Sequence, residues 1–385
     1  MTLIKSISGM RGTIGGAVGT NLTPIDIVEM ASAYGMWLKQ QHDNHKVVIG
    51  RDGRISGEIV SSLVVNTLRS LGIDIIDLDY STTPTVEMAV KFYDAGGGII
   101  LTASHNPKQW NALKLLNEKG EFISAEDGQA LLDIAASRSF DYSSVEQLGQ
   151  VIKKDDALDL HINAILNLPF INADLIRSRG FKVAVDCINS TGAIALPPLL
   201  DALGCTYDLI NSEVSGDFAH NPEPLAENLK ELSSVVLENN LDLGIAVDPD
   251  VDRLVFTCPS GELFGEEYTL VAAADFVLRY KKGATVSNLS SSRALRDISA
   301  LRGMNYEAAA VGEVNVVKKM KEVNAAIGGE GNGGVILPDL HYGRDALVGI
   351  AIVLNLLAED GINLDQLKEK YPQYHIIKSK IYFKP

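Results

Sequence analysis

The stretch KVVIGRDGRISGEIVSSLVVNTLRSLGIDIIDLDYSTTPTVEMAVKFYDAGGGIIL, residues 46–101, decides the fold class of this chain. It contains three short, largely apolar runs, at 46–50, 73–78 and 98–101, whose length and composition are typical of buried strands. Between the first two runs, residues 55–71 repeat apolar side chains at helical spacing. Strands that alternate with helices predict an α/β fold.

The same pattern recurs further along the chain. Runs at 182–186 and 243–247 have the composition of buried strands, and residues 193–203 have helical spacing. The pattern restarts after the polar stretch 137–156 and again after 258–262. We therefore predict three α/β domains, with bounds 1–152, 153–258 and 259–370.

Composition limits the classes of function. The chain has 385 residues, 46% of them hydrophobic and 22% charged, with a formal net charge of -15. This charge disfavours nucleic acids and anionic membranes as partners, because both bind broad basic surfaces. An anionic substrate would need Arg and Lys placed locally.

Neither end of the chain nor its cysteines suggest secretion. The first residues, MTLIKSISGMRG, lack the apolar run of a signal peptide. The longest apolar stretch, 346–358, is shorter than the roughly 20 residues of a membrane-spanning helix. The three cysteines are widely spaced, so we expect core residues instead of disulfides or a thiolate metal site. We expect a cytoplasmic protein that binds no membrane.

The loop Thr102-Ala-Ser-His-Asn-Pro107 follows the strand at 98–101. Pro107 prevents the strand from continuing, and Ser104, His105 and Asn106 bring a hydroxyl, an imidazole and an amide to one turn. The structural alternative is a turn whose side chains bond their own backbone. A serine hydrolase is disfavoured, because no G-x-S-x-G motif surrounds Ser104 and His105 is poorly placed to be its base. We expect Ser104 to be exposed in this loop.

The loop Asp248-Pro-Asp-Val-Asp-Arg253 follows the strand at 243–247. Its three carboxylates alternate, so an extended loop would point them all to one side. Their repulsion requires a cation between them, and oxygen donors suit a hard divalent ion such as Mg²⁺. An EF-hand is excluded, since its sixth and twelfth positions would be Arg253 and Pro259 instead of Gly and Glu. A solvated acidic turn is the structural alternative.

A third loop, Gly328-Gly-Glu-Gly-Asn-Gly-Gly334, places Glu330 and Asn332 among five glycines. Glycine lets the backbone approach a ligand closely, while a carboxylate and an amide can bond sugar hydroxyls. Alone, such a glycine-rich turn is weak evidence for a site. Cationic side chains near glycine-rich turns are candidates for phosphate binding, although each alone would be a solvated surface charge. They are Arg11, Arg51, Arg54, Lys114, Arg253 and Arg344.

Together these motifs resemble those of the α-D-phosphohexomutase family, which includes phosphoglucomutase, phosphomannomutase and phosphoglucosamine mutase. The motifs occur in family order over the chain: Ser8-Gly-Met-Arg-Gly12, then Thr102 to Pro107, Asp248 to Arg253, and Gly329 to Gly333. The resemblance implies three consecutive similar α/β domains with mixed sheets around a central cleft.

The resemblance also implies a role for each motif. Ser104 would be the phosphoserine, and one Mg²⁺ would be held by Ser104, Asp248, Asp250 and Asp252. Residues matching those that surround the transferred phosphoryl group are Arg11, His105, Lys114 and Arg253, with Lys114 as general acid or base. Candidate substrate-binding residues are Glu330, Gly331, Asn332 and Arg344.

The implied reaction interconverts hexose 6-phosphate and hexose 1-phosphate, with a hexose 1,6-bisphosphate as intermediate and activator. A phosphoserine carries about −1.5 to −2 charges, so a cation beside it lowers the charge barrier to a sugar hydroxyl. Two rivals remain open. One is a haloacid-dehalogenase-type phosphatase with Asp248 as nucleophile, which would leave Ser104 without a role. The other is a non-catalytic sugar-phosphate-binding module.

Two departures from the family limit what the resemblance implies. Family members continue into a further small domain that clamps the substrate's other phosphate, and here residues 371–385 resemble the entry to that domain. We therefore expect poor turnover by the chain as it stands. The sugar loop also has Gly331, Gly333 and Gly334 where many members carry Glu or Ser and His. Glucosamine phosphate is the favoured substrate, with glucose and mannose phosphates open, and the sequence predicts no oligomeric state.

Overall fold

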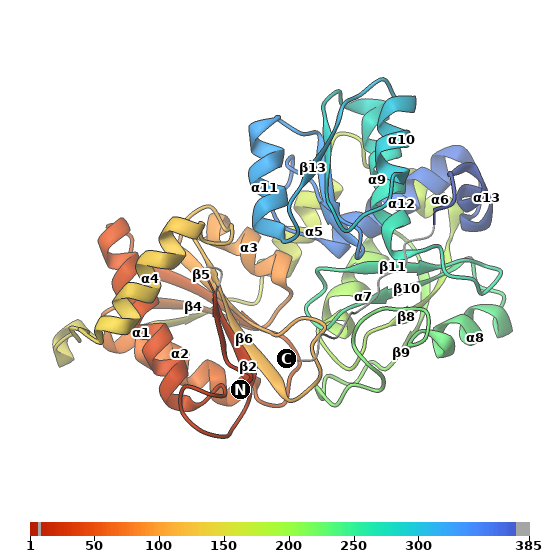
Figure 1. Ribbon diagram of the computed structural model, residues 1–385. Coiled ribbons are helices and arrows are strands. Elements are labelled where there is room, and N and C mark those ends of the chain that lie inside the picture. Colours follow the sequence, from red (N-terminus) through yellow and green to blue (C-terminus); the bar gives the residue numbers. More distant parts are fainter. Residues whose placement is uncertain (7–8, 375–385) are drawn as a thin grey trace, which may run out of the picture.

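A computed structural model describes residues 1–6 and 9–374 of the chain. They form three α/β lobes, each built on its own sheet (Figure 1). Each lobe has one sheet, and each sheet mixes parallel and antiparallel pairs. The predicted fold class of three similar α/β domains with mixed sheets is confirmed.

The first lobe contains a seven-stranded sheet in the order β1-β2-β6-β5-β3-β4-β7. Its strands are β1 (Ile4–Ser6), β2 (Gly9–Thr13), β3 (Lys46–Arg51), β4 (Asp74–Tyr80), β5 (Gly97–Leu101), β6 (Trp110–Leu116) and β7 (Val151–Lys153). Its helices are α1 (Pro24–Gln41), α2 (Gly57–Ser70), α3 (Thr83–Phe92) and α4 (Ala125–Ser137), followed by a short 3-10 turn, Val145–Gln147.

The second lobe contains a four-stranded sheet in the order β11-β10-β8-β9, in which β11 alone runs antiparallel to its neighbour. Its strands are β8 (Lys182–Asp186), β9 (Thr206–Ile210), β10 (Leu243–Val247) and β11 (Leu254–Thr257). Its helices are α5 (Ala157–Leu166), α6 (Ala173–Arg179), α7 (Gly192–Ala202) and α8 (Lys230–Glu238).

The third lobe contains a four-stranded sheet in the order β13-β12-β14-β15. Its strands are β12 (Thr285–Asn288), β13 (Tyr306–Ala309), β14 (Ile327–Glu330) and β15 (Gly334–Ile336). Its helices are α9 (Glu266–Tyr280), α10 (Ala294–Leu301), α11 (Glu313–Glu322), α12 (Ala346–Asp360) and α13 (Leu364–Lys370).

The second and third lobes share one continuous core, whereas the first lobe has its own. Helix α12 lies in the shared core and buries side chains on nearly all of its faces. This explains why the apolar run at 346–358 is so long, because a helix without a solvent face needs no polar stripe. The three cysteines are buried and unpaired, as predicted.

Among the described residues, no single helix is long and apolar enough to cross a membrane, although the bent pair α12 and α13 passes that test of length and composition together.

The strands predicted from apolar runs all exist, and their bounds agree with the structure within two residues. One motif lies at the carboxyl end of a strand in each lobe: two of these strands, β5 and β10, were predicted, and the third, β14, was not. The loop with Ser104 follows β5, the loop with Asp248 follows β10, and Glu330 is the last residue of β14. Because loops at the carboxyl ends of strands gather at one sheet edge, each lobe presents one motif to the same space. The domain bounds themselves, and the role given to residues 371–385, stay predictions, and positions 375–385 lie outside the described residues.

Candidate active site

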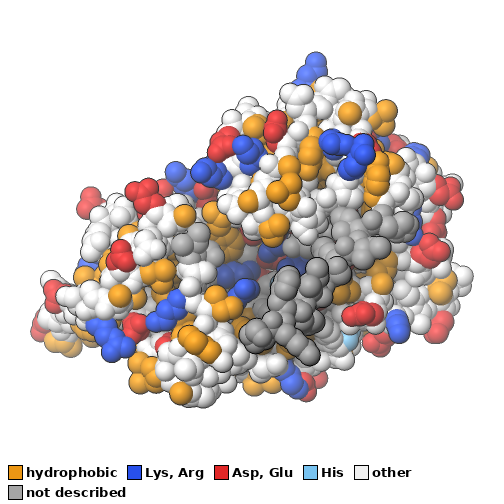
Figure 2. Space-filling view, viewed as in Figure 1, with side chains coloured by type: hydrophobic (Ala, Val, Ile, Leu, Met, Phe, Trp, Pro, Cys, Tyr) orange, Lys and Arg blue, Asp and Glu red, His pale blue; other side chains and the backbone are white. Residues whose placement is uncertain are grey.

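A pocket of about 570 Å³ lies between the lobes. Figure 2 shows Lys and Arg side chains inside a central hollow. Most of the candidate residues line this pocket, and they come from all three lobes. They are Arg11, Ser104, His105, Lys114, Arg253, Glu330, Asn332 and Arg344. Motifs that are up to 333 positions apart in the sequence are therefore brought into one cavity, with Gly331 between two of the lining residues.

Ser104 lies on the turn after β5 with a positive φ of 49°, which is uncommon for a residue other than glycine. Its hydroxyl donates a 2.6 Å hydrogen bond to Oδ2 of Asp248 and lies 3.5 Å from Nδ1 of His105. The expectation of an exposed serine is wrong, because Ser104 is only 7% exposed. The neighbouring lobe covers the loop but leaves the serine on the pocket wall.

Asp248, Asp250 and Asp252 are fully buried, and each places a carboxylate oxygen within 4.8 Å of the other two. The predicted convergence is present, but the predicted extended loop is not. The segment is a turn, closed by the Val251 amide on the Asp248 carbonyl, with Val251 at a φ of 60°. The Asp252 and Arg253 amides donate to Oδ1 of Asp248, so the turn itself gathers the carboxylates.

Negative charge is in excess around these three aspartates. Burial, followed by repulsion from Asp252 and Asp250, raises the pKa of Asp248 well above its usual range. Burial acts the same way on Asp250, but the Lys114 ammonium 2.7 Å away outweighs it and lowers the pKa of Asp250. Oδ1 of Asp250 and Oδ1 of Asp252 are buried and have no hydrogen-bond partner among the described residues. Unused, buried, anionic oxygens are what an oxygen-preferring cation would bind.

Lys114 and His105 line the same pocket as Ser104. Burial acts to lower the pKa of Lys114, but the carboxylates of Asp250 and Asp252 raise it above its usual value. Burial, with the Arg253 guanidinium as the next cause, lowers the pKa of His105 to about 4. At neutral pH the pocket therefore presents a charged ammonium and a neutral imidazole near the serine.

The remaining cations of the pocket differ in how firmly they are held. Arg11 lies on β2 with an exposed side chain that lines the pocket. Nε of Arg253 is 4.0 Å from both Asp248 and Asp252, and has no hydrogen-bond partner among the described residues. Its Nη1 is 3.5 Å from Glu223. Both arginines keep donors for an anionic ligand.

The glycine-rich loop is tied to the metal-site turn by close backbone contact. Gly333 has a φ of +89°, and a Cβ there would lie 2.4 Å from the Leu254 carbonyl, so only glycine fits. The Leu254 amide donates to the Gly333 carbonyl at 3.2 Å. Asn332 uses Oδ1 to accept from the Gly334 amide. The loop is therefore held against β11, one residue beyond the Asp248 turn.

Arg344 links the glycine-rich loop to the aspartates. It is buried, and its guanidinium donates to Asp252 at 2.6 Å, Glu330 at 2.8 Å and Glu313 at 3.1 Å. Asn288 donates to the other oxygen of Glu330 at 2.7 Å. Glu330 and Arg344 line the pocket, and they also form an ion pair with each other.

Sequence reasoning missed several residues of this site. Thr83, at the start of α3, donates to Oδ2 of Asp250 at 2.5 Å, and its amide donates to the Asp250 carbonyl. Glu313, at the start of α11, accepts from Arg344. Neither stands in a motif, so only the folded chain reveals them.

Two of the predicted phosphate-binding cations lie elsewhere. Arg51 pairs with Asp79 at 2.7 Å and lies over the Tyr80 ring. Arg54 is buried and donates to Asp52 and to backbone carbonyls. The prediction that these two arginines supply charge to a phosphate in the pocket is therefore wrong, because neither lines it, Arg51 pairs with Asp79, and other groups occupy the donors of Arg54.

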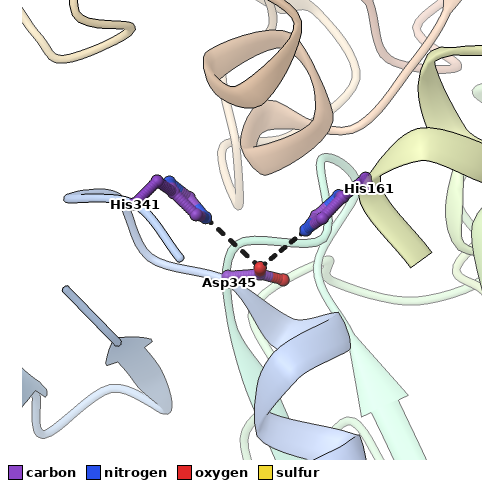
Figure 3. A group of neighbouring side chains, drawn as sticks. All are labelled: His161, His341 and Asp345. Atoms are coloured by element: carbon purple, nitrogen blue, oxygen red, sulfur yellow. Dashed lines mark hydrogen bonds and ion pairs between the residues drawn. The ribbon is translucent and has the colours of Figure 1, made fainter. Parts of the chain in front are cut away.

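A second buried cluster joins the lobes beside the site (Figure 3). His161 on α5 and His341 on the loop before α12 both point Nε2 at Oδ2 of Asp345, at 2.9 and 3.2 Å. Nδ1 of His341 is 3.2 Å from the carboxylate of Glu87, on α3 of the first lobe. The cluster therefore connects the first and third lobes through buried charge.

In this second cluster both oxygens of Asp345 have donors, whereas both oxygens of Glu87 and Nδ1 of His341 are buried without a hydrogen-bond partner among the described residues. Oδ1 of Asp345 accepts from the Leu347 and Val348 amides and caps α12, while Oδ2 accepts from both histidines. Burial acts to lower the pKa of His341, but contacts with the carboxylates of Asp345 and Glu87 outweigh it and raise this pKa to about 9. Burial raises the pKa of Glu87 to about 8, with His341 opposing the rise. A protonated His341 supplies positive charge between the carboxylates of Glu87 and Asp345.

Comparison with known proteins agrees with this geometry. Models of domains I, II and III of phosphoglucomutase/phosphomannomutase, each described as alpha/beta/alpha, match residues 4–141, 159–261 and 265–374. The chain is 34% identical to a phosphoglucomutase/phosphomannomutase of Thermococcus kodakarensis, covering 96% of this chain and 81% of that protein. It is 30% identical to a phosphoglucosamine/phosphogalactosamine mutase of Sulfurisphaera tokodaii, with the same two coverages.

A solved structure gives the same result for the fold. The phosphoglucomutase/phosphomannomutase family protein of Burkholderia thailandensis superimposes with a TM-score of 0.84 at 25% identity, covering 96% of this chain and 80% of that one. Fold and site together define an intramolecular phosphotransferase of the isomerase class. The chain belongs to the phosphoglucomutase/phosphomannomutase family, within the α-D-phosphohexomutases.

Proposed function

We propose that the chain interconverts a hexose 6-phosphate and a hexose 1-phosphate, with Ser104 as the carrier of the transferred phosphoryl group. The observation that carries this proposal is the contact between Ser104 Oγ and Asp248 Oδ2 on the wall of a pocket lined by cationic side chains. The Ser104 hydroxyl therefore lies on the wall of the pocket that would hold the substrate, and it contacts the cluster of aspartates.

We propose Mg²⁺ as the ion of the aspartate cluster. The donor set fits, because three carboxylates converge and two of their buried oxygens are unused within the described part of the chain. Asp248, Asp250 and Asp252 would hold the ion, together with a phosphate oxygen on Ser104. When bound, the ion neutralises negative charge on the phosphoryl group that is transferred.

The proposed reaction has two balanced transfers. In the first, a sugar hydroxyl oxygen bonds to phosphorus as the bond from phosphorus to Ser104 Oγ breaks, which gives hexose 1,6-bisphosphate. In the second, Ser104 Oγ takes the phosphoryl group from the other end of the sugar. The first transfer releases the proton of the sugar hydroxyl, and the second returns a proton to the freed sugar oxygen. We propose Lys114 as the group that takes up and returns this proton, once an ion on Asp250 and Asp252 offsets the carboxylate charge that keeps its amine protonated. Arg11, Arg253 and His105 bind and orient the phosphoryl oxygens.

We propose glucosamine phosphate as the preferred sugar, recognised by Glu330, Gly331 and Asn332, with Arg344 holding Glu330 in place. A relative named for phosphoglucosamine and phosphogalactosamine supports this choice, and one named for glucose and mannose phosphates supports the alternative. Comparison of kcat/KM for glucosamine, glucose and mannose 6-phosphates, with hexose 1,6-bisphosphate as activator, decides between them. A preference for either neutral sugar would overturn the proposed specificity.

Labelling tests the proposed carrier. The enzyme should take up phosphate from labelled hexose 1,6-bisphosphate, and peptide mapping should place it on Ser104. Because Asp248 lies 2.6 Å from that hydroxyl, the chemistry of the label matters as well as its position. A phosphoserine survives hydroxylamine, whereas an aspartyl phosphate does not. Label lost to hydroxylamine, or retained by Ser104→Ala, would show that Asp248 is the nucleophile and that the phosphatase alternative holds.

A further inference from the structure

Arg54 is the largest fully buried side chain of the described chain, at 1% exposure. It lies in the loop between β3 and α2, and the proposed reaction gives it no contact with substrate. A buried guanidinium is costly unless every donor is paired, so its surroundings show what it stabilises.

All five N–H donors of Arg54 have acceptors, and four of these acceptors are carbonyls of the segment that carries Ser104. Nε donates to Oδ2 of Asp52 at 2.9 Å. The two terminal nitrogens donate to Pro107 at 2.8 Å, Trp110 at 3.0 Å, Asn106 at 2.7 Å and Ser104. One rigid, planar group therefore fixes four carbonyls of residues 104–110.

Asp52 holds the backbone amide of Ser104 indirectly, through the hydroxyl of Thr102. Its Oδ2 accepts from the Thr102 hydroxyl at 2.6 Å, and that hydroxyl oxygen accepts from the Ser104 amide at 2.9 Å. Both backbone polar groups of Ser104 are therefore held, the carbonyl by Arg54 directly and the amide through Thr102 and Asp52.

The serine needs this support because of its backbone. A φ of +49° is uncommon for a residue other than glycine and persists only where surrounding structure enforces it. This conformation is the one in which Oγ reaches Asp248 and faces the pocket. Relaxation of the turn would move the hydroxyl away from both.

We infer that Arg54 is a positioning residue: it holds the Ser104 turn in its left-handed conformation, and so sets the place of the hydroxyl that accepts and donates the phosphoryl group. The inference rests on the proposed role of Ser104 as carrier. It differs from a phosphate-binding role, which the occupied donors of Arg54 exclude.

A second arginine in the same motif, Arg51, serves as a control for substitutions of Arg54. Arg51, three positions earlier, pairs with Asp79 and contacts the Tyr80 ring, and the residues described here give it no contact with the Ser104 turn. Arg51→Lys and Arg54→Lys make the same chemical change at the two arginines of Gly50-Arg-Asp-Gly-Arg54. Lysine keeps the charge beside Asp52 but lacks the planar fork of donors.

The decisive measurement is the single-turnover rate at which saturating hexose 1,6-bisphosphate phosphorylates Ser104 in the full chain. Arg54→Lys should slow it by about 100-fold, the cost of displacing a reacting atom by about 1 Å. Arg51→Lys should change it by no more than about twofold, as expected for a surface substitution. Mg²⁺ affinity from calorimetry and half-saturation by bisphosphate should stay near the parent values in both, since the aspartates and pocket cations are intact.

A second variant guards against simple unfolding. In Arg54→Ala, added guanidinium ion can enter the vacated space, so phosphorylation should recover with guanidinium, while Arg51→Ala should not respond. Thr102→Val, which removes the acceptor of the Ser104 amide, should slow phosphorylation in the same manner. Circular dichroism and thermal unfolding confirm that each variant is folded.

The outcomes separate the two proposals. If the parent enzyme takes no label on Ser104, the proposed function fails. If the parent is labelled and folded Arg54→Lys is labelled equally fast, the positioning role fails. A slow Arg54→Lys whose Mg²⁺ affinity falls to the same extent would also overturn it, because Arg54 would then support the metal site instead of the serine turn.

Discussion

Two buried clusters in this molecule each bring three metal-ligating side chains within 4.8 Å, and only one is suited to an ion. The aspartates at 248, 250 and 252 are all acceptors, and two of their buried oxygens have no partner among the described residues. In the second cluster, both oxygens of Asp345 are occupied, by two backbone amides and two histidines. Buried oxygens without a hydrogen-bond partner occur in both clusters, on Asp250 and Asp252 in one and on Glu87 in the other, so the donor types distinguish them: three carboxylates in the first, against two imidazoles and a carboxylate in the second.

The two clusters also differ in how their negative charge is balanced. Near the pocket, five buried carboxylates contact three cationic side chains, so carboxylates outnumber cations there, and a divalent ion would reduce this imbalance. The carboxylates are Asp248, Asp250, Asp252, Glu313 and Glu330, and the cations are Lys114, Arg253 and Arg344. In the second cluster, His341 lies between Glu87 and Asp345 and supplies the cation itself.

The largest expected effect comes from breaking the aspartate cluster. Asp250→Asn keeps the shape but removes a charge and a ligand, so Mg²⁺ affinity and kcat/KM should each fall by at least about 100-fold, more than loss of an outer-shell partner alone. Calorimetry and coupled assays measure the two quantities. The matched variant, His161→Gln, removes a ligand-type residue from the other cluster and should leave Mg²⁺ affinity unchanged. Equal losses in the two variants would erase the distinction between the clusters.

A second prediction breaks the histidine cluster. His341→Leu leaves Glu87 and Asp345 without the cation between them and should lower the free energy of unfolding by about 3–5 kcal/mol, as for other broken buried ion pairs. Urea unfolding measures it. Addition of Glu87→Gln should restore part of the loss, since one of the uncompensated charges is then gone. A parent-like stability for His341→Leu alone would show that the contact between the first and third lobes carries no energy.

A third prediction uses pH to sharpen the same comparison. The pKa of His341 is raised from 6.5 to about 9 on folding, so its stabilising contribution is complete below about pH 6.5 and disappears as the pH rises through about 9. The stability difference between the parent and His341→Leu should therefore shrink from pH 6.5 to pH 9.5. A difference that grows over this range would contradict the sign.

The smallest effect is expected at an exposed contact between the same two lobes. Lys321 pairs with Glu121, and the lysine side chain is 39% exposed. Solvent screens such a pair, so Lys321→Ala should cost no more than about 1 kcal/mol, in contrast to His341→Leu. Urea unfolding of the two variants side by side tests whether burial is the reason for the difference.

Much of the site could be predicted from sequence because each motif directly follows a strand. Ser104 and Asp248 stand at strand ends, where apolar runs give way to polar groups, and the structure brings these residues into contact. The burial of Ser104 could not be predicted, since it depends on the second lobe meeting the loop. The turn at Val251 was missed because alternating carboxylates suggest an extended loop and do not show the amide bonds to Asp248 that close the turn.

Residues without a motif stayed hidden for a different reason. His161 and Asp345 are 184 positions apart, and Thr83 and Asp250 are 167 apart, so only tertiary contacts join them. Arg54 was visible in a motif, but its role was misjudged, because a sequence shows a positive charge and not the carbonyls that occupy it.

The most direct test of the account is a crystal structure of the full chain, treated with hexose 1,6-bisphosphate and grown with Mn²⁺ in place of Mg²⁺, with anomalous data to locate the ion. We predict one anomalous peak enclosed by Asp248, Asp250 and Asp252, and phosphate density joined to Ser104 Oγ. A peak between His161, His341 and Asp345, or an empty aspartate cluster beside an unmodified Ser104, would contradict the account.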